Sequence, residues 1–168
     1  MGVLGLDTVE LDGCRAVRTV FKAARDGGGR GITYIGSITL PFRDFSYVIK
    51  IQCPEVGITG VRESAIMAER LSRGLVQVKQ EALGKVHLRR SWDLEGWLVD
   101  LDDQSAPLSL RRNVSEDPIY DSRFPDHPLS RARRFLERVQ RTIRIGDDIR
   151  SAPTFTHSAE RRKLWKLR

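Results

Sequence analysis

Arginines recur at helical spacing along one segment near the C-terminus. They stand at Arg131, Arg134, Arg138 and Arg141. Steps of three and four residues place side chains on one face of a helix, and planar guanidinium groups suit the oxygens of phosphates and carboxylates. The pattern indicates either a surface that binds an acidic partner or the solvated back of an amphipathic helix.

The last twelve residues add a second basic segment around a tryptophan. It contains Arg161, Arg162, Lys163 and Trp165. Such residues could combine phosphate neutralisation with base stacking, or could equally form a disordered terminus. Residues 123–168 hold thirteen Lys and Arg against five Asp and Glu, whereas the whole chain has a net charge of +7. The positive charge therefore belongs to the C-terminal quarter, and the rest of the chain is nearly neutral.

Acidic residues between positions 93 and 103 are the candidates for metal or acid–base chemistry. On a strand, Asp100 and Asp102 would point the same way about 7 Å apart, close enough to share a hard cation. No His or Glu stands at ligand spacing beside them, and the two Asp before Gln104 are also typical of a turn. We therefore expect no metal site and no cofactor, and Asp100 and Asp102 remain weak candidates for metal ligands.

The remaining reactive side chains are isolated from one another. His87, His127 and His157 have no ligand partners at suitable spacing, and we interpret His127 as a local structural residue at the start of a helix. Cys14 and Cys53 lie in strand-like segments and are predicted to be buried free thiols. We predict no catalytic residue, and so expect that the protein is not an enzyme.

Three strands are predicted from alternating residues between positions 14 and 53. In residues 14–24 the predicted apolar face carries Val17 and Phe21, and the opposite face carries Arg18 and Lys22. Residues 32–40 and 45–53 alternate in the same way, with Gly36 as a possible bulge. Antiparallel strands with one covered face are the simplest explanation.

Two helices are predicted to pack on this sheet. Residues 59–74 form the first, with Thr59 as the N-cap and with a face of small residues that would lie close to the sheet. These small residues are Val61, Ala65, Ala68 and Ser72. Residues 126–145 form the second, with Asp126 as the cap and an apolar stripe opposite the arginines. Between the helices we expect a strand at residues 94–100 and a long loop at 102–124.

These elements predict one α+β domain over residues 1–150, followed by a basic tail over residues 151–168 with the composition of a flexible segment. No apolar run approaches the roughly 20 residues that a membrane helix needs, and no secretory signal is evident, so we expect a cytoplasmic protein. Arg outnumbers Lys by 23 to 6, which we attribute to a GC-rich bacterial genome.

The order of elements resembles that of a known superfamily. The layout resembles the α/β/α sandwich shared by the photosystem extrinsic subunit P proteins and the Ran-binding Mog proteins. The strand end Tyr47–Glu55 and the helix start Asp126–Arg131 resemble those of uncharacterised bacterial proteins with this layout. That resemblance implies an antiparallel sheet with helices packed on it and a partner-binding, non-catalytic module. We therefore expect an accessory protein that binds an acidic protein partner, or alternatively one that binds nucleic acid through the arginine helix and tail.

Overall fold

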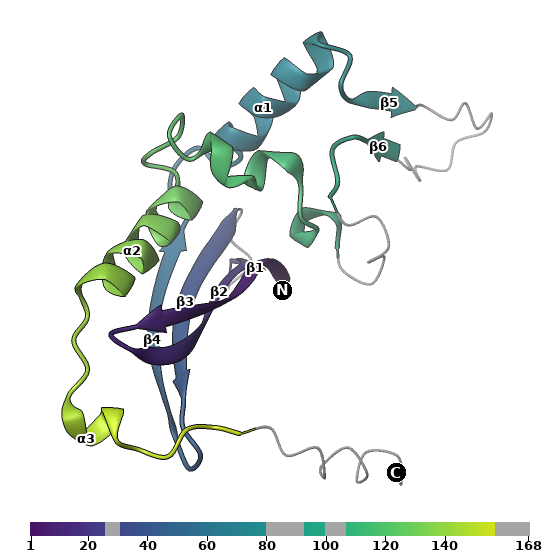
Figure 1. Ribbon diagram of the computed structural model, residues 1–168. Helices are drawn as coiled ribbons and strands as arrows, with labels where there is room; N and C mark the ends of the chain where they lie inside the picture. The colour runs from purple at the N-terminus through teal and green to yellow at the C-terminus, as the bar shows by residue number, and fades with distance from the viewer. Residues whose placement is uncertain (26–30, 80–92, 100–106, 157–168) are drawn as a thin grey trace, which may run out of the picture.

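A four-stranded antiparallel sheet forms the body of the protein. The computed structural model describes residues 1–25, 31–79, 93–99 and 107–156 (Figure 1). The strands are β1 (Gly2–Leu11), β2 (Cys14–Ala24), β3 (Ile32–Pro41) and β4 (Ser46–Pro54), and they lie in this order across the sheet. Helix α2 (Pro128–Thr142) packs on one face, chiefly over β3 and β4. The predicted α+β class with an antiparallel sheet is confirmed.

Strand β1 was not predicted, and a tight turn explains it. Asp12 and Gly13 join β1 to β2, and both have positive φ, at 45° and 83°. Two positive φ values are what a two-residue type I′ hairpin needs, because its twist matches that of the flanking strands. The hairpin therefore begins at the N-terminus and adds an edge strand beside β2.

The prediction of the buried face of β2 was wrong. Val17 and Phe21 are only half-buried, whereas Ala16, Val20 and Lys22 on the opposite face are buried. Lys22 can be buried because its ammonium group has a buried carboxylate partner, contributed by a distant part of the chain.

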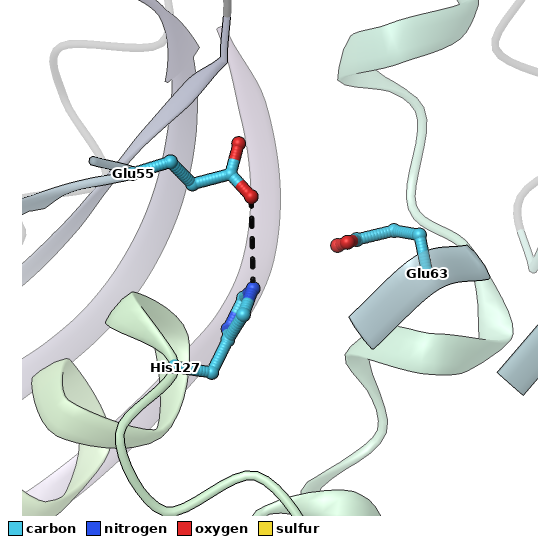
Figure 2. Close-up of side chains that lie close together, drawn as sticks. All are labelled: Glu55, Glu63 and His127. Carbon is cyan, nitrogen blue, oxygen red and sulfur yellow. Dashed lines mark ion pairs between the residues drawn. The ribbon is translucent and has the colours of Figure 1, made fainter. Parts of the chain in front are cut away.

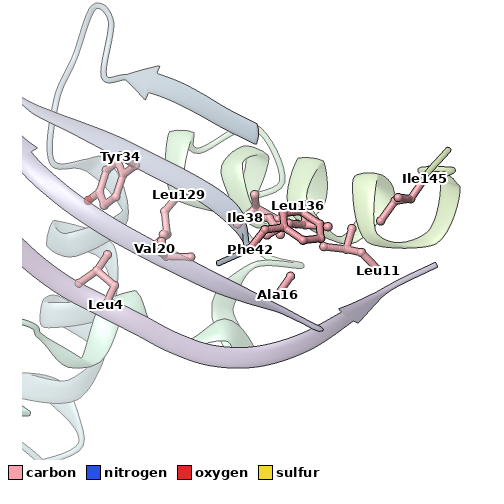
Figure 3. Close-up of a cluster of buried hydrophobic side chains, with 11 residues drawn as sticks. Leu4, Leu11, Ala16, Val20, Tyr34, Ile38, Phe42, Leu129, Leu136 and Ile145 are labelled. Atoms are coloured by element: carbon pink, nitrogen blue, oxygen red, sulfur yellow. The ribbon is translucent and has the colours of Figure 1, made fainter. Parts of the chain in front are cut away.

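The core lies between this face of the sheet and α2 (Figure 3). Leu129, Ala132 and Leu136 of α2 are buried there, as the apolar stripe predicted. Gly36 is not a bulge, since the strand register runs regularly through it. An added Cβ at Gly36 would lie 2.9 Å from Leu136 Cδ1, so glycine permits the close approach of helix and sheet.

Helix α1 (Val61–Ser72) is present, but it does not lie on the sheet through its small residues. Val61, Ala65, Ala68 and Ser72 are exposed, whereas Arg62 and Ile66 are buried. Ile66 packs with Val76 and Trp97 in a second, smaller hydrophobic cluster. The N-cap is Gly60, in the left-handed conformation without a side-chain cap, so the assignment of Thr59 was also wrong.

The segment before α2 is more ordered than the predicted loop. Residues 107–124 contain three short 3₁₀ helices, η2 (Leu108–Leu110), η3 (Val114–Glu116) and η4 (Pro118–Tyr120). Asn113 caps η3 through a capping box with Glu116. The strand expected at 94–100 is shorter in the structure: β6 (Asp93–Glu95) ends before Gly96 and pairs with β5 (Gln77–Lys79), and Asp100 lies outside the described residues.

The chain returns to the sheet after α2. Helix α3 (Asp147–Arg150) follows, and the Arg43 N–H donates to the Pro153 carbonyl beside a bridge between Phe42 and Thr154. Neither cysteine forms a disulfide; Cys53 is buried and Cys14 is half-buried. Among the described residues, no helix is long and apolar enough to cross a membrane.

Candidate functional site

The predicted arginine row lies on the outer side of α2. Arg131, Arg134, Arg138 and Arg141 are all exposed, and none of their guanidinium groups forms an ion pair or hydrogen bond with another described residue. Arg133 differs, because its half-buried guanidinium group pairs with Asp121 at 3.0 Å. The other predicted positions, Arg161, Arg162, Lys163, Trp165, Asp100 and Asp102, lie outside the described residues.

A second set of polar side chains converges where β4, α1 and α2 meet. Glu55 follows β4, Glu63 lies in the first turn of α1, and His127 directly precedes α2 (Figure 2). One ligand atom from each residue lies within 4.8 Å of the other two. The sequence predictions assigned no binding or metal role to either glutamate and treated His127 as structural.

His127 is the N-cap of α2. Its Nδ1 accepts a hydrogen bond from the Leu129 N–H at 3.2 Å, whereas Asp126 is exposed, so the assignment of Asp126 as the cap was wrong. A neutral imidazole carries one proton, and an accepting Nδ1 leaves that proton on Nε2. The Nε2 atom is buried without a hydrogen-bond partner and lies 3.8 Å from Glu55 Oε1.

Glu55 joins the start of β3 to the start of α1. Its Oε2 accepts from the Ile32 N–H at 2.8 Å, and its Oε1 accepts from the Gly60 N–H at 3.0 Å. Burial raises the pKa of Glu55, but His127 and these two N–H groups outweigh burial and hold the pKa below its ordinary value. The Glu55 carboxylate is therefore ionised at neutral pH, and it contacts the start of β3, the N-cap of α1 and the N-cap of α2.

Glu55→Gln should lower the free energy of unfolding by about 1–3 kcal/mol at pH 7, because the amide cannot accept from both N–H groups. A lowered folded-state pKa adds stability above the ordinary value of 4.5, and that stability is lost as pH falls through the folded-state pKa. The deficit of the variant should therefore shrink at pH 3. Urea unfolding at pH 7 and pH 3 measures this deficit in the free energy of unfolding, with Glu137→Gln at an exposed position as the control. An equal deficit at the two pH values would contradict this account.

Glu63 faces Glu55 and His127 from the other side (Figure 2). Its Oε1 accepts from the Tyr34 hydroxyl at 3.1 Å, and its Oε2 is buried without a partner. Burial and three nearby glutamates, Glu63 first among them, raise the pKa of Tyr34 far above its ordinary value, so the phenol remains a donor. The Tyr34 ring also packs edge-on against His127, with ring centroids 5.3 Å apart.

An open cavity of about 660 Å³ adjoins this cluster. Tyr34, Glu55 and Glu63 line it, together with Trp97 and the ion pair between Lys22 and Glu116. The side chains on this wall are thus rich in carboxylates, in contrast to the basic outer side of α2. Such a wall favours cations and hydrogen-bond donors.

Comparisons of the chain with family models, with curated proteins and with solved structures found no match.

Proposed function

We propose that the protein is a non-enzymatic accessory module that binds an acidic protein partner through the outer side of α2. The observation that carries this proposal is the exposed row of Arg131, Arg134, Arg138 and Arg141, with no described residue neutralising it. At 1.5 Å per residue, the row extends about 15 Å along a rigid helix. Its guanidinium groups are therefore available to a partner without breaking an ion pair within the described part of the chain.

The spacing suits a helical partner. Arginines at steps of three and four residues match carboxylates at the same steps on a second helix, since both repeats follow one helical period. The opposite side of α2 is held on the sheet by Leu129 and Leu136, so the row is presented in a fixed orientation. The alternative partner is nucleic acid, favoured by the net charge of +8 over residues 123–168, to which Arg161, Arg162 and Lys163 contribute.

Reversing two of these charges should weaken binding of an acidic polypeptide about tenfold or more. Exposed ion pairs contribute roughly 0.2–1 kcal/mol each, and Arg134→Glu/Arg138→Glu replaces two attractions with two repulsions. Fluorescence anisotropy with labelled poly-glutamate, in 50–300 mM NaCl, measures the change. Arg73→Glu is the control, because Arg73 is an exposed arginine at the C-cap of α1.

Two results would change this conclusion. Equal affinities for wild type and the double variant would remove the arginine row as the binding surface. Tighter binding of a 20-base-pair duplex than of poly-glutamate, with a log–log salt slope of about −0.9 per phosphate, would favour the nucleic-acid alternative.

A further inference from the structure

Two buried polar atoms in the Glu55, Glu63 and His127 cluster lack a hydrogen-bond partner. The described residues contain three buried side-chain polar atoms without a hydrogen bond, and Glu63 Oε2 and His127 Nε2 are two of them. The His127 side chain is only 9 % exposed. Buried polar groups in native proteins almost always have a partner, and one that lacks it calls for a water or an ion. The two atoms face the same small space, so a single bound species could satisfy both.

The distances fit an ion at the centre of the cluster. For three atoms no more than 4.8 Å apart, some point lies within about 2.8 Å of all of them. Bonds from a transition-metal ion to histidine nitrogen and carboxylate oxygen are about 2.0–2.2 Å, so inward shifts of less than 1 Å would complete the site. The adjoining cavity leaves room for a water ligand at a further coordination position.

We infer that Glu55, Glu63 and His127 bind one divalent transition-metal ion, of the class that includes Zn²⁺ and Mn²⁺. One imidazole nitrogen and two carboxylates suit these ions, whereas Ca²⁺ requires six to eight oxygen ligands. The two carboxylates offset the charge of the ion. This site is separate from the arginine row and does not depend on the proposed function.

Other described residues orient the two carboxylates. The Tyr34 hydroxyl donates to Glu63 Oε1, while the Ile32 and Gly60 N–H groups donate to Glu55. Outer partners of this kind fix ligand geometry in metal sites.

Coordination by His127 requires a change of tautomer. The ion needs the Nε2 lone pair, so the Nε2 proton leaves and a proton binds at Nδ1, which keeps the imidazole neutral. The Leu129 N–H then loses its acceptor. Loss of this N-cap hydrogen bond costs about 1 kcal/mol, which lowers the affinity for the metal ion about fivefold. Protein metal sites bind tightly enough to tolerate a loss of that size. Metal binding should therefore perturb the first turn of α2.

Isothermal titration calorimetry of the full chain with Zn²⁺ tests the site, followed by Mn²⁺ and Mg²⁺. We expect one ion per chain, with affinity falling from Zn²⁺ to Mn²⁺ to Mg²⁺. Glu63→Gln and His127→Asn should each weaken Zn²⁺ binding at least 100-fold. Asparagine is a preferred N-cap, so His127→Asn removes the ligand while keeping the cap. Asp126→Asn, at an exposed carboxylate beside the site, should bind as wild type does.

A second readout uses the unaltered protein. On addition of Zn²⁺, the backbone amide signal of Leu129 in ¹⁵N NMR spectra should shift in slow exchange, because its acceptor is withdrawn. Absence of saturable binding would overturn the inference and leave a water between Glu63 and His127. Binding of equal strength in Glu63→Gln and His127→Asn, with no shift at Leu129, would overturn it too and assign the ion to other residues.

Discussion

Arg62→Met should lower the free energy of unfolding by about 3–5 kcal/mol, because it removes the fully buried cation of an ionic network and leaves its hydrogen-bond acceptors without this donor. Arg62 lies in the first turn of α1, and it is 0 % exposed. Its Nη1 lies 2.8 Å from Asp121 Oδ1 and 2.9 Å from Ser130 Oγ, while Nε and Nη2 donate to the Ser115 and Asp117 carbonyls. This one side chain connects α1 to η3, to η4 and to the first turn of α2.

Methionine has a similar volume but no donor, so the buried carbonyls would lose their hydrogen bonds. Urea unfolding gives the change in stability, and hydrogen exchange should show that the α1 amides lose protection first. Arg73→Met is the matched control at the C-cap of the same helix, because the Arg73 side chain is 65 % exposed and, among the described residues, forms an ion pair only with Glu69. We expect a change within about 0.5 kcal/mol for the control. A loss below 1 kcal/mol for Arg62→Met would show that the network contributes little.

The buried charges explain the largest differences between prediction and structure. Alternation along residues 14–24 placed Lys22 on the solvent side, as a lysine would be without a partner. Its partner Glu116 lies 94 residues away, and the partner of Arg62 lies 59 residues away. Local periodicity contains no information about such pairs, so the buried faces of β2 and α1 could not be predicted from their own residues.

The elements with local signals were predicted correctly, and one such signal was missed. The alternation in β3 and β4 and the apolar stripe of α2 each depend on side chains within one element. The turn at Asp12 and Gly13 also carried a local signal, since an Asp-Gly pair favours a type I′ hairpin. Reading that pair as a turn would have predicted β1.

The two candidate sites also differ in whether local sequence could predict them. The arginine row lies on one helix, so its spacing alone placed all four guanidinium groups on the outer side. Glu55, Glu63 and His127 come from three elements, and they converge only because the end of β4 and the first turns of α1 and α2 meet. His127 gave one clue, because a histidine just before Pro128 stands where an N-cap is expected.

Lys22→Met should be as damaging as Arg62→Met, with a loss of about 3–5 kcal/mol at pH 7. Lys22 Nζ lies 2.6 Å from Glu116 Oε1 and donates to the Arg111 carbonyl at 2.6 Å. The two side chains of the ion pair are only 2 % and 1 % exposed. Without the ammonium group, the Glu116 carboxylate stays buried but loses the charge that pairs with it directly. An unpaired buried carboxylate destabilises the fold more than the buried ion pair does, because water cannot solvate it.

The pH dependence of this loss distinguishes the buried charge from a packing defect. Burial raises the pKa of Glu116, and Lys22 opposes that rise, so the pKa should climb further in the variant. An acid with a raised folded-state pKa destabilises the fold as pH rises above its ordinary value of 4.5, and the penalty disappears below that value. Urea unfolding should therefore show that Lys22→Met approaches wild type in acid and falls behind between pH 5 and 8.

Replacing the unpaired Glu116 carboxylate with a neutral amide should restore part of the lost stability. In Lys22→Met/Glu116→Gln, the side-chain amide oxygen can still accept from the Asn113 N–H, which donates to Glu116 Oε2 at 2.8 Å, while no charge remains buried. The double variant should be more stable than Lys22→Met at pH 7, and it should lack the additional loss of stability that Lys22→Met shows as pH rises above 5. If both variants are equally unstable at every pH, the lost packing of the lysine chain, and not the unpaired carboxylate, sets the cost.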